Sequence, residues 1–346
     1  MSSSAPSASQ SQKPASRMPV GFKDQLRSKR SFVFGLTMLL AVLVIGAFTV
    51  SGFLSAPSIR SMLLLGAFLG LASVGQTLVA LLGGLDLSIP YVISAANVVT
   101  LYFISQGLPS FLSIVLVLAL GTVIGIINGL ISLKLQNQAI IVSLGVGFAT
   151  IGLTQIITSV GVTNDGGTEG VVPGWLANIA SINGTTFGIP IPPIVVIWIL
   201  LSVALVIVMR STWFGRSIYA LGGNRSAARL MRISEGRRWV MVYALSGLFS
   251  AMTGVALLGF TGGAFVRVGD PYLFLTVAAV AVGGTSLLGG RGGYGSTIIG
   301  VLVLTALTSL LLGLGLNNNA QQFVLGLLIV PIVAIYARNA HIRQQI

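Results

Sequence analysis

Long apolar runs separated by short polar or glycine-rich stretches fill the chain from residue 32 onward. An α-helix needs about 20 predominantly apolar residues to cross the roughly 30 Å hydrocarbon core of a bilayer. The runs therefore predict an all-α polytopic membrane protein with about ten transmembrane helices. The expected spans are 32–54, 61–82, two within 87–133 that divide at 107–109, 139–160, 194–209, 239–260, 272–282, 298–312 and 323–336.

Polar segments lie around and within this transmembrane domain, which we place at 32–337. Residues 1–31 are rich in Ser, Pro and Gln and then basic, which is typical of a disordered tail. The 161–193 segment is rich in Gly, Asn, Thr and Pro and is expected to be a loop outside the membrane. The 210–238 segment is strongly basic, and 338–346 is expected to be a short polar tail.

The basic residues are distributed unevenly, and this predicts an orientation. With a cytoplasmic N-terminus, all nineteen Lys and Arg residues except Arg60 and Arg267 fall on the cytoplasmic side. Loops on that side of membrane proteins carry an excess of such residues. We therefore expect a bacterial inner-membrane protein with both termini and 210–238 in the cytoplasm and 161–193 in the periplasm.

Composition narrows the class of protein. Of the 346 residues, 54% are hydrophobic and only 7% are charged, whereas a soluble domain has about a quarter charged residues. The net charge of +13 is spread between apolar runs, so a lipid membrane and not a nucleic acid is the expected neighbour. The chain has no cysteine, and its one histidine, His341, is in the polar tail, so we expect no catalytic residue and no metal site. Because a Gly-x-x-x-x-Gly-Lys-Ser/Thr motif is absent, we expect no nucleotide hydrolysis by this chain.

The basic segment contains a candidate docking element. A glycine pair at 222–223 breaks the chain, and Asn224 is placed to cap a following helix. Residues 225–233 have the pattern of a short two-faced helix, too short to cross a bilayer and too apolar for a free linker. One face would hold Arg225, Arg229 and Arg232. Such a helix suits a groove on a soluble partner; the alternative is a plain cytoplasmic loop whose arginines only set the topology.

Polar residues within the apolar runs are candidates for a translocation pathway. Asp86 follows a glycine pair and precedes Pro90. A carboxylate near the membrane is costly, so it is either a substrate or proton site or a cap for the next helix. Amide and hydroxyl side chains within the spans are expected to face the bundle interior, where they line a path or bond to neighbouring helices. This set comprises Gln76, Thr77, Asn97, Asn128, Thr154 and Gln155.

Two segments of the chain resemble each other weakly in sequence. Residues 83–90 contain Gly-Gly, Asp and Pro in that order, and so do residues 262–271. The two segments lie five spans apart on opposite sides of the expected membrane, as an inverted duplication requires. Because glycine is frequent in this chain, chance is the alternative explanation.

Five ordered motifs resemble one known family, the inner-membrane permease subunits of ATP-binding-cassette importers for ribose and related monosaccharides. They are Gly83-Gly84-Leu85-Asp86-Leu87-Ser88, Gly125-Ile126-Ile127-Asn128-Gly129, Ile141-Val142-Ser143-Leu144-Gly145, the stretch 215–230, and 283–292. They run from the second expected span to the ninth in the family's order. The ordered set is more specific than any single motif.

This resemblance implies a type II-like importer permease fold of ten helices, in which two permease subunits, as a homodimer or a heterodimer, form the path. It also implies a periplasmic sugar-binding protein and a cassette ATPase, with ATP and Mg held by the ATPase and no cofactor held by this chain. The segment that couples to the ATPase would comprise Gly215, Arg216, Gly222, Gly223, Asn224, Ala227, Ala228, Arg229 and Leu230. Gating hinges are expected at Gly83, Gly84, Gly283 and Gly284.

The chain departs from the family pattern at several positions, which leaves the substrate and the choice between homodimer and heterodimer open. The departures are Gln138 and Ile140 in place of Pro and Phe, Pro90 in place of Gly, Met231-Arg232-Ile233 in place of Ser-Gly-Ile, and Leu273 and Leu275 in place of an acidic pair, with Asp270-Pro271 before it.

Three alternative functions remain. A permease for branched-chain amino acids, or for another small polar solute, shares the broad architecture. A secondary transporter would carry charges within its spans, whereas almost all charges here lie at the ends of the spans. A membrane-embedded enzyme would need a cluster of acids, histidines or cysteines that this composition hardly supplies.

Overall fold

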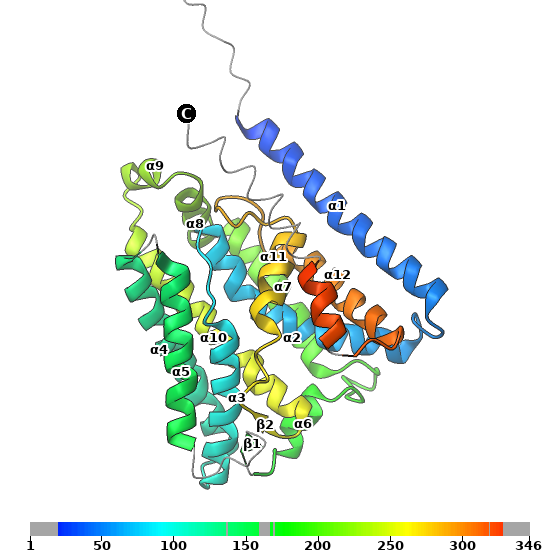
Figure 1. The fold of residues 1–346 in the computed structure, drawn as a ribbon. Coiled ribbons are helices and arrows are strands. Elements are labelled where there is room, and N and C mark those ends of the chain that lie inside the picture. Colours follow the sequence, from blue (N-terminus) through cyan, green and yellow to red (C-terminus); the bar gives the residue numbers. More distant parts are fainter. Residues whose placement is uncertain (1–19, 136–137, 159–166, 169, 318, 328–346) are drawn as a thin grey trace, which may run out of the picture.

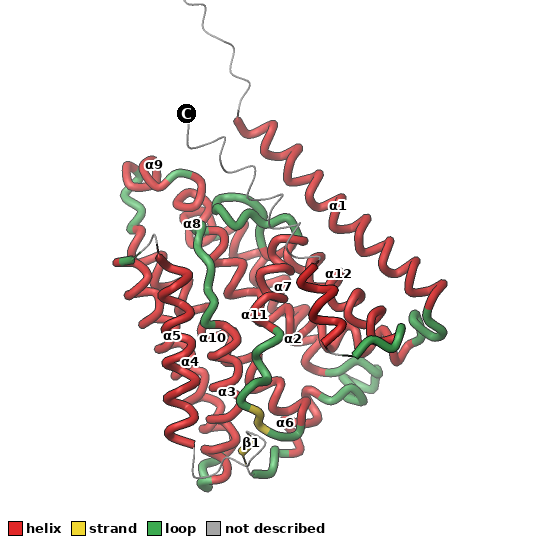
Figure 2. Tube along the Cα trace, in the orientation of Figure 1, coloured by secondary structure: helices red, strands yellow, loops and turns green. Residues whose placement is uncertain are grey.

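The computed structural model describes residues 20–135, 138–158, 167–168, 170–317 and 319–327. The expected all-α architecture is confirmed for this part of the chain (Figures 1 and 2). The helices are α1 Val20–Thr49, α2 Ala56–Leu81, α3 Ile89–Ser105, α4 Ser110–Lys134, α5 Ala139–Thr158, α6 Gly174–Ala180, α7 Pro193–Ser211, α8 Trp213–Gly223, α9 Arg225–Leu230, α10 Glu235–Thr261, α11 Tyr272–Val282 and α12 Tyr294–Gly313. Two short strands, β1 Gly167–Thr168 and β2 Ala264–Phe265, pair antiparallel.

The apolar helices agree with the expected spans up to α12. Within the described residues, six helices, α2, α4, α5, α7, α10 and α12, are long and apolar enough to cross a membrane, and α1, α3 and α11 contain shorter apolar stretches. Residues 319–327 are also helical. The expected tenth span, 323–336, extends past the described residues, so the count of ten stays a prediction.

The first part of α1, residues 20–31, and the whole of α6 lie in segments for which no regular structure was expected. α1 begins at Val20, because 20–31 is rich in Lys, Arg, Leu and Gln, which favour helix. α6 lies within the 161–193 segment and packs against α10. The division of the chain into tails, membrane domain and loops stays a prediction.

α2 forms the centre of the bundle. Nearly all of its second half is buried, and α7, α10, α11 and α12 pack around it. α10 lies closest to α4, because side chains at Gly121 and Gly125 of α4 would overlap the α10 backbone or Ala251. In return, a side chain at Gly247 of α10 would overlap the Gly121 carbonyl oxygen. Small residues at such crossings let two membrane helices approach until their backbones touch.

α3 and α11 are too short to span a membrane as single helices, with 17 and 11 residues. Each follows a non-helical segment. We call 82–88, between α2 and α3, the first break, and 262–271, between α10 and α11, the second break. The apolar pattern did not separate these segments from their helices, because both are composed largely of glycine and apolar residues.

The two breaks run towards each other from opposite ends of the molecule. The first break begins where α2 meets α8, at the end that carries α9, whereas the second begins at β2, which pairs with β1 at the other end (Figure 1). The second break reaches the start of α3 in the interior, where a side chain at Gly269 would overlap the Pro90 carbonyl oxygen, two residues past the first break. Interrupted helices that enter from opposite sides are the arrangement that inverted repeats produce in transporters.

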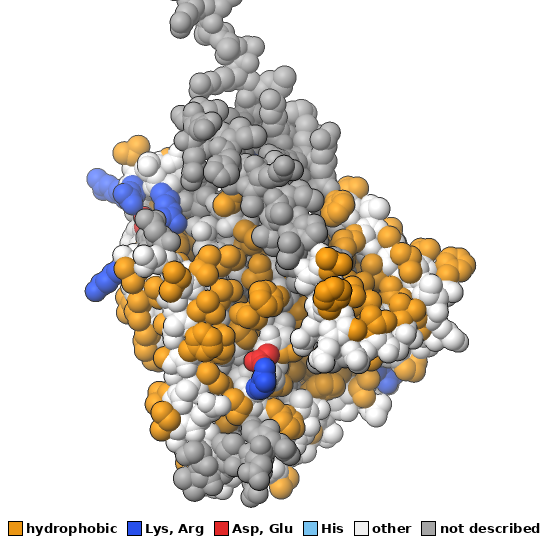
Figure 3. All heavy atoms as spheres, in the orientation of Figure 1, with side chains coloured by type: hydrophobic (Ala, Val, Ile, Leu, Met, Phe, Trp, Pro, Cys, Tyr) orange, Lys and Arg blue, Asp and Glu red, His pale blue; other side chains and the backbone are white. Residues whose placement is uncertain are grey.

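The surface matches this architecture. Figure 3 shows hydrophobic side chains over much of one face, and basic side chains gathered near the end where Figure 1 places α9. Large apolar side chains of α4, α5 and α7 are exposed, among them Phe111, Ile141 and Leu200. Exposed apolar side chains of this number are expected where lipid or another membrane subunit covers the helices.

Candidate functional site

The basic segment forms a compact projection, which we call the knob: residues 213–234, comprising α8, α9 and the turn that follows. It connects α7 to α10 at one end of the molecule (Figure 1). A side chain at Gly215 would overlap the Met209 backbone, so glycine lets α8 fold back on the end of α7. The Arg216 guanidinium donates to the Ser211 carbonyl oxygen at 3.0 Å and holds the same corner.

Asn224 caps α9, as the sequence predicts. Its side-chain oxygen accepts a hydrogen bond from the Ala227 backbone N–H at 3.0 Å. Ala228 is buried against the rest of the chain, whereas Ala227 is exposed. The side chains of Leu230 and Met231 are 87% and 71% exposed. The tip of the knob therefore presents apolar side chains to whatever lies beyond it.

The expected face of three arginines is wrong. α9 ends at Leu230, and Arg232 has φ 57°, in the left-handed region that glycine prefers. The Ile233 N–H donates to the Ala228 carbonyl oxygen, and the Arg232 N–H donates to that of Arg229. This pattern is a Schellman cap, which stops the helix before Arg232 can join its face. The left-handed position also coincides with the glycine of the family's Ser-Gly-Ile ending.

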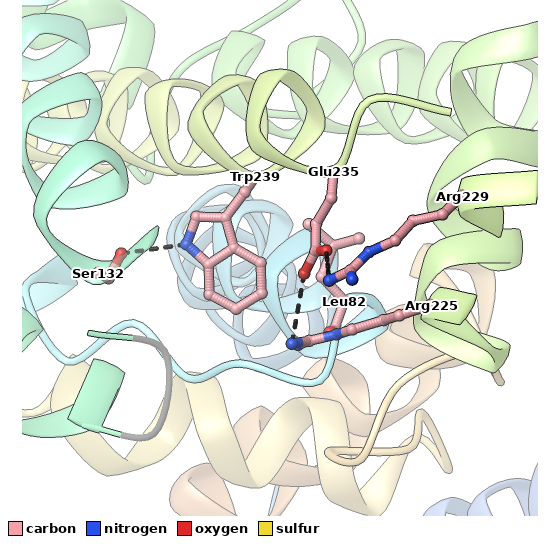
Figure 4. A network of polar contacts seen from close by, with 6 residues as sticks. All are labelled: Leu82, Ser132, Arg225, Arg229, Glu235 and Trp239. Atoms are coloured by element: carbon pink, nitrogen blue, oxygen red, sulfur yellow. Dashed lines mark hydrogen bonds and ion pairs between the residues drawn. The ribbon is translucent and has the colours of Figure 1, made fainter. Parts of the chain in front are cut away.

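The remaining two arginines form ion pairs within the protein. Glu235, in the first turn of α10, pairs with Arg229 at 2.9 Å and with Arg225 at 3.4 Å (Figure 4). Arg225 also donates to the Leu82 carbonyl oxygen at 3.4 Å and lies 5.4 Å from the centre of the Trp239 ring. The knob is thus fastened both to α10 and to the end of α2.

Three glycine-containing segments meet at the base of the knob, at what we call the glycine junction: residues 81–84, the end of α8 at 222–223, and residues 288–290. A side chain at Gly222 would overlap the Leu81 carbonyl oxygen, and the Gly290 N–H donates to that same oxygen at 2.9 Å. Gly83, with φ 81°, faces the Leu288 carbonyl oxygen. Expected coupling and gating residues distant in sequence therefore lie side by side.

Tyr219 strengthens the junction from α8. Its hydroxyl donates to the Gly292 carbonyl oxygen at 2.9 Å. Burial raises the pKa of the Tyr219 phenol, although Arg210 acts in the opposite direction, so the group stays protonated and keeps this hydrogen bond at neutral pH.

The other expected hinge glycines lie around the junction. Gly84 packs against the side chains of Val79, Trp239 and Tyr243. Gly283 closes on the Ser296 backbone at the start of α12, and Gly284 has φ 84°. Gly83 and Gly284 adopt conformations that favour glycine, whereas Gly84 and Gly283 are glycines because neighbouring atoms leave no room.

Asp86 is the centre of a buried polar cluster in the first break. Its Oδ1 accepts from the Ser88 N–H, from the Ser88 hydroxyl at 2.6 Å and from the Asn128 amide at 3.1 Å, and its Oδ2 accepts from the Ser246 hydroxyl at 2.6 Å. The Leu87 N–H donates to the Ser143 hydroxyl. The carboxylate thus holds the first break against α4 and α10. It accepts no hydrogen bond from the backbone N–H groups in the first turn of α3, so it does not cap that helix.

The remaining pathway candidates are dispersed. The Asn97 amide donates to the Gly254 carbonyl oxygen and accepts from the Phe265 N–H, so it holds the second break. Thr77 donates to the Ser73 carbonyl oxygen and contacts Thr297, and Thr154 donates to its own helix. Among the described residues, neither polar atom of the buried Gln76 amide has a hydrogen-bonding partner. Gln155 departs from the expectation of an inward-facing side chain, because it is exposed on α5.

Comparison with known proteins gives the family. A model described as "Branched-chain amino acid transport system / permease component" matches residues 58–333. The chain belongs to this permease family. It is therefore a multi-pass membrane protein of a transport system, and catalysis is not the function of its family.

Several curated relatives of this permease cover most of its length. Ribose import permease protein RbsC of Haemophilus influenzae is 34% identical over 91% of this chain and 94% of the relative. The protein of the same name in Bacillus subtilis is 33% identical over 87% of this chain and 90% of the relative. Fructose import permease protein FruF of Bifidobacterium longum is 30% identical over 78% of this chain and 74% of the relative. No solved structure matches the chain.

Residues that connect the permease's candidate site were missed by sequence reasoning. Glu235, Trp239 and Ser246 all lie on α10. Glu235 pairs with the arginines of the knob, Trp239 contacts Arg225 and donates to Ser132 of α4, and Ser246 donates to Asp86. Glu235 is the one acidic residue among the arginines of 210–238, and this was the one feature of the sequence that could have marked it as their ion-pair partner.

Proposed function

We propose that this chain is the membrane-spanning permease subunit of an ATP-binding-cassette importer for a monosaccharide. A separate cassette ATPase drives the importer from the cytoplasmic side, where the knob docks, and a periplasmic binding protein delivers the sugar to the opposite end. Two permease subunits form the path, each with the type II-like fold and both termini in the cytoplasm. ATP and Mg belong to the ATPase.

The observation that supports this proposal best is the attachment of the knob. An exposed apolar tip at Leu230 and Met231 suits a groove on a soluble partner. The base of the knob touches the first break through Leu81 and Leu82. Movement of the tip is therefore passed directly to a non-helical segment inside the membrane domain, which is the requirement for coupling nucleotide hydrolysis to a change of access.

A permease for branched-chain amino acids is the second candidate. It is favoured by the family description and by an ion pair between Arg267 and Asp270 in the second break, where charges of both signs would suit a zwitterion. The sugar is preferred for two reasons. The two charges already neutralise each other at 2.8 Å, and the relatives reported above are named for ribose and fructose.

Co-purification tests the docking role. Gly223 has open space around it and Ala227 is exposed, so Gly223→Trp and Ala227→Trp leave the packing of the chain intact while obstructing the knob. In cells that also produce the ATPase and binding protein of the same organism, we expect both variants to insert normally and to lose the ATPase on affinity purification.

The matched control is Gly174→Trp, at an equally open glycine on α6, at the opposite end of the molecule. It should retain the ATPase. Normal recovery of the ATPase with both knob variants would refute the docking role. Uptake of L-leucine instead of D-ribose or D-fructose by the parent transporter would favour the second candidate.

A further inference from the structure

The second break carries polar groups into the interior of the membrane domain. The Phe265 N–H donates to the Asn97 side chain at 2.9 Å, and the Gly269 N–H donates to the Ser94 hydroxyl at 3.0 Å. These two bonds fix the break along α3. Because Ser94 and Asn97 are both buried, the break is held in one position and does not behave as a loose loop.

The depth of this segment follows from the helix that comes after it. α11 has 11 residues, which gives a length of about 16 Å at 1.5 Å per residue. Its far end leads to the glycine junction, at the end of the molecule that carries the knob. The hydrocarbon core is about 30 Å thick. About 16 Å of helix therefore separates Asp270 from that end of the bundle, which is roughly half the thickness of the hydrocarbon core.

An ion pair stands exposed at this depth. The Arg267 Nε donates to Asp270 Oδ2 at 2.8 Å, and the two side chains are 89% and 45% exposed. Charged groups at this depth are costly in lipid, and they normally face a water-filled cavity or a transport path. The surface around this pair is therefore expected to face such a path.

Aromatic side chains lie around the pair. Tyr91 of α3 follows Pro90, whose carbonyl oxygen lies against Gly269, next to Asp270. Tyr91 in turn packs against Phe148 of α5, with ring centres 5.0 Å apart. Phe274 is largely exposed in the first turn of α11. The pair thus offers two hydrogen-bonding groups on a part of the surface that also carries aromatic side chains.

We infer that Arg267 and Asp270 form a sugar-contacting station at the midpoint of the translocation path, an inference that rests on the proposed monosaccharide importer. The Asp270 carboxylate accepts hydrogen bonds from sugar hydroxyls, and the Arg267 guanidinium donates to hydroxyl oxygens through the N–H groups that its ion pair leaves over. The aromatic rings contact the apolar C–H faces of the sugar.

The neutralised pair suits transport as well as recognition. A single fixed charge would hold counter-ions, whereas an ion pair presents donors and acceptors with no net charge. Its exposure keeps the contact weak, because charged hydrogen bonds at exposed sites are screened by water. A passing sugar is therefore bound and released without a large free-energy barrier.

The test is made on the complete transporter in proteoliposomes, with binding protein and ATPase present and D-ribose, D-xylose and D-fructose as probes. We expect Arg267→Gln and Asp270→Asn to assemble normally and to keep ATP hydrolysis stimulated by loaded binding protein within about twofold of the parent. Uptake of the sugars that the parent transports should fall by about tenfold, because a charge-assisted hydrogen bond is lost. Sugar moved per ATP is the decisive ratio.

Two further variants separate sugar contact from a merely structural ion pair. Arg60→Gln removes the other arginine expected on the periplasmic side and should leave uptake unchanged. The double variant Arg267→Asp with Asp270→Arg exchanges the charges but misplaces donors and acceptors, so uptake should stay low. Full recovery of uptake in the double variant would mean that the pair only stabilises the protein, and the station would be rejected.

The remaining outcomes also decide the matter. Unchanged uptake in the two single variants, an equal fall of uptake and hydrolysis, or failure of the subunits to assemble would each overturn the station; the last would make the pair an interface between permease subunits. If the parent transporter moves none of the sugars, the proposed function fails, and that failure is separate from any result on the variants.

Discussion

The two breaks have opposite surroundings although both interrupt helices of the same membrane domain. In the first break the one charged group, Asp86, is 2% exposed and accepts four hydrogen bonds from residues of three segments. In the second break the charges of Arg267 and Asp270 lie largely in the open. A buried, fully bonded charge fixes geometry, whereas an exposed pair is available to a ligand. We therefore assign the first break to force transmission and the second to solute contact.

The largest effect is expected at the centre of the first break. Asp86→Ala leaves the Ser88 N–H, the Asn128 amide and the Ser246 hydroxyl without their acceptor in a buried site. The free energy of unfolding should fall by about 3 kcal/mol or more, measured by thermal unfolding of the purified protein in detergent. Asp270→Ala is the matched control, and because that carboxylate is exposed it should change the free energy of unfolding by less than about 1 kcal/mol. An equal loss of unfolding free energy in both variants would contradict the assignment of a structural role to the first break alone.

An intermediate effect is expected at the glycine junction. Gly222→Ala places a methyl group on the Leu81 carbonyl oxygen, and the strain should lower the free energy of unfolding by about 2 kcal/mol. Since this contact joins the knob to the end of α2, directly before the first break, sugar-stimulated ATP hydrolysis by the assembled transporter should fall as well. The neighbouring Gly223→Ala meets open space and should have almost no effect on either measurement. Identical behaviour of the two variants would show that the contact with Leu81 transmits nothing.

The smallest effect is expected at the end of α9. Arg232→Gly relieves the left-handed strain of about 1 to 2 kcal/mol, partly offset by the greater freedom of glycine in the unfolded chain. The net expectation is a gain of about 0.5 to 1 kcal/mol in the free energy of unfolding, with uptake unchanged. Ser226→Gly, inside α9, should instead lower it by a few tenths to about 1 kcal/mol. A loss of stability in Arg232→Gly would mean that the arginine side chain, and not the turn, stabilises the knob.

Much of the architecture was accessible from sequence, because the thickness of a bilayer sets the length of an apolar run. The apolar helices α2, α3, α4, α5, α7, α10, α11 and α12 follow the expected spans, and the Asn224 cap followed from residue type and position. These features depend on local physics, which a single sequence contains.

The breaks and the site depend on contacts between distant segments. Glycine and leucine at 82–88 suit a helix end as well as a non-helical segment, so the apolar pattern cannot distinguish them. Ser246 lies 160 positions from Asp86, and nothing in its own surroundings marks it as a partner. The inward turn of Arg225 towards Glu235 and the left-handed Arg232 likewise depend on how α9 meets α10.

The tight crossing of α4 and α10 has a mechanical consequence. The backbones of α4 and α10 touch at Gly125 and Gly247 and cannot slide past each other without collision, so the two helices form one rigid unit. Glu235 lies at one end of this unit and pairs with the knob, and about 16 Å further along α10 the Ser246 hydroxyl donates to Asp86. In the proposed importer, a tilt of the knob therefore moves the Asp86 carboxylate and the first break together with α10.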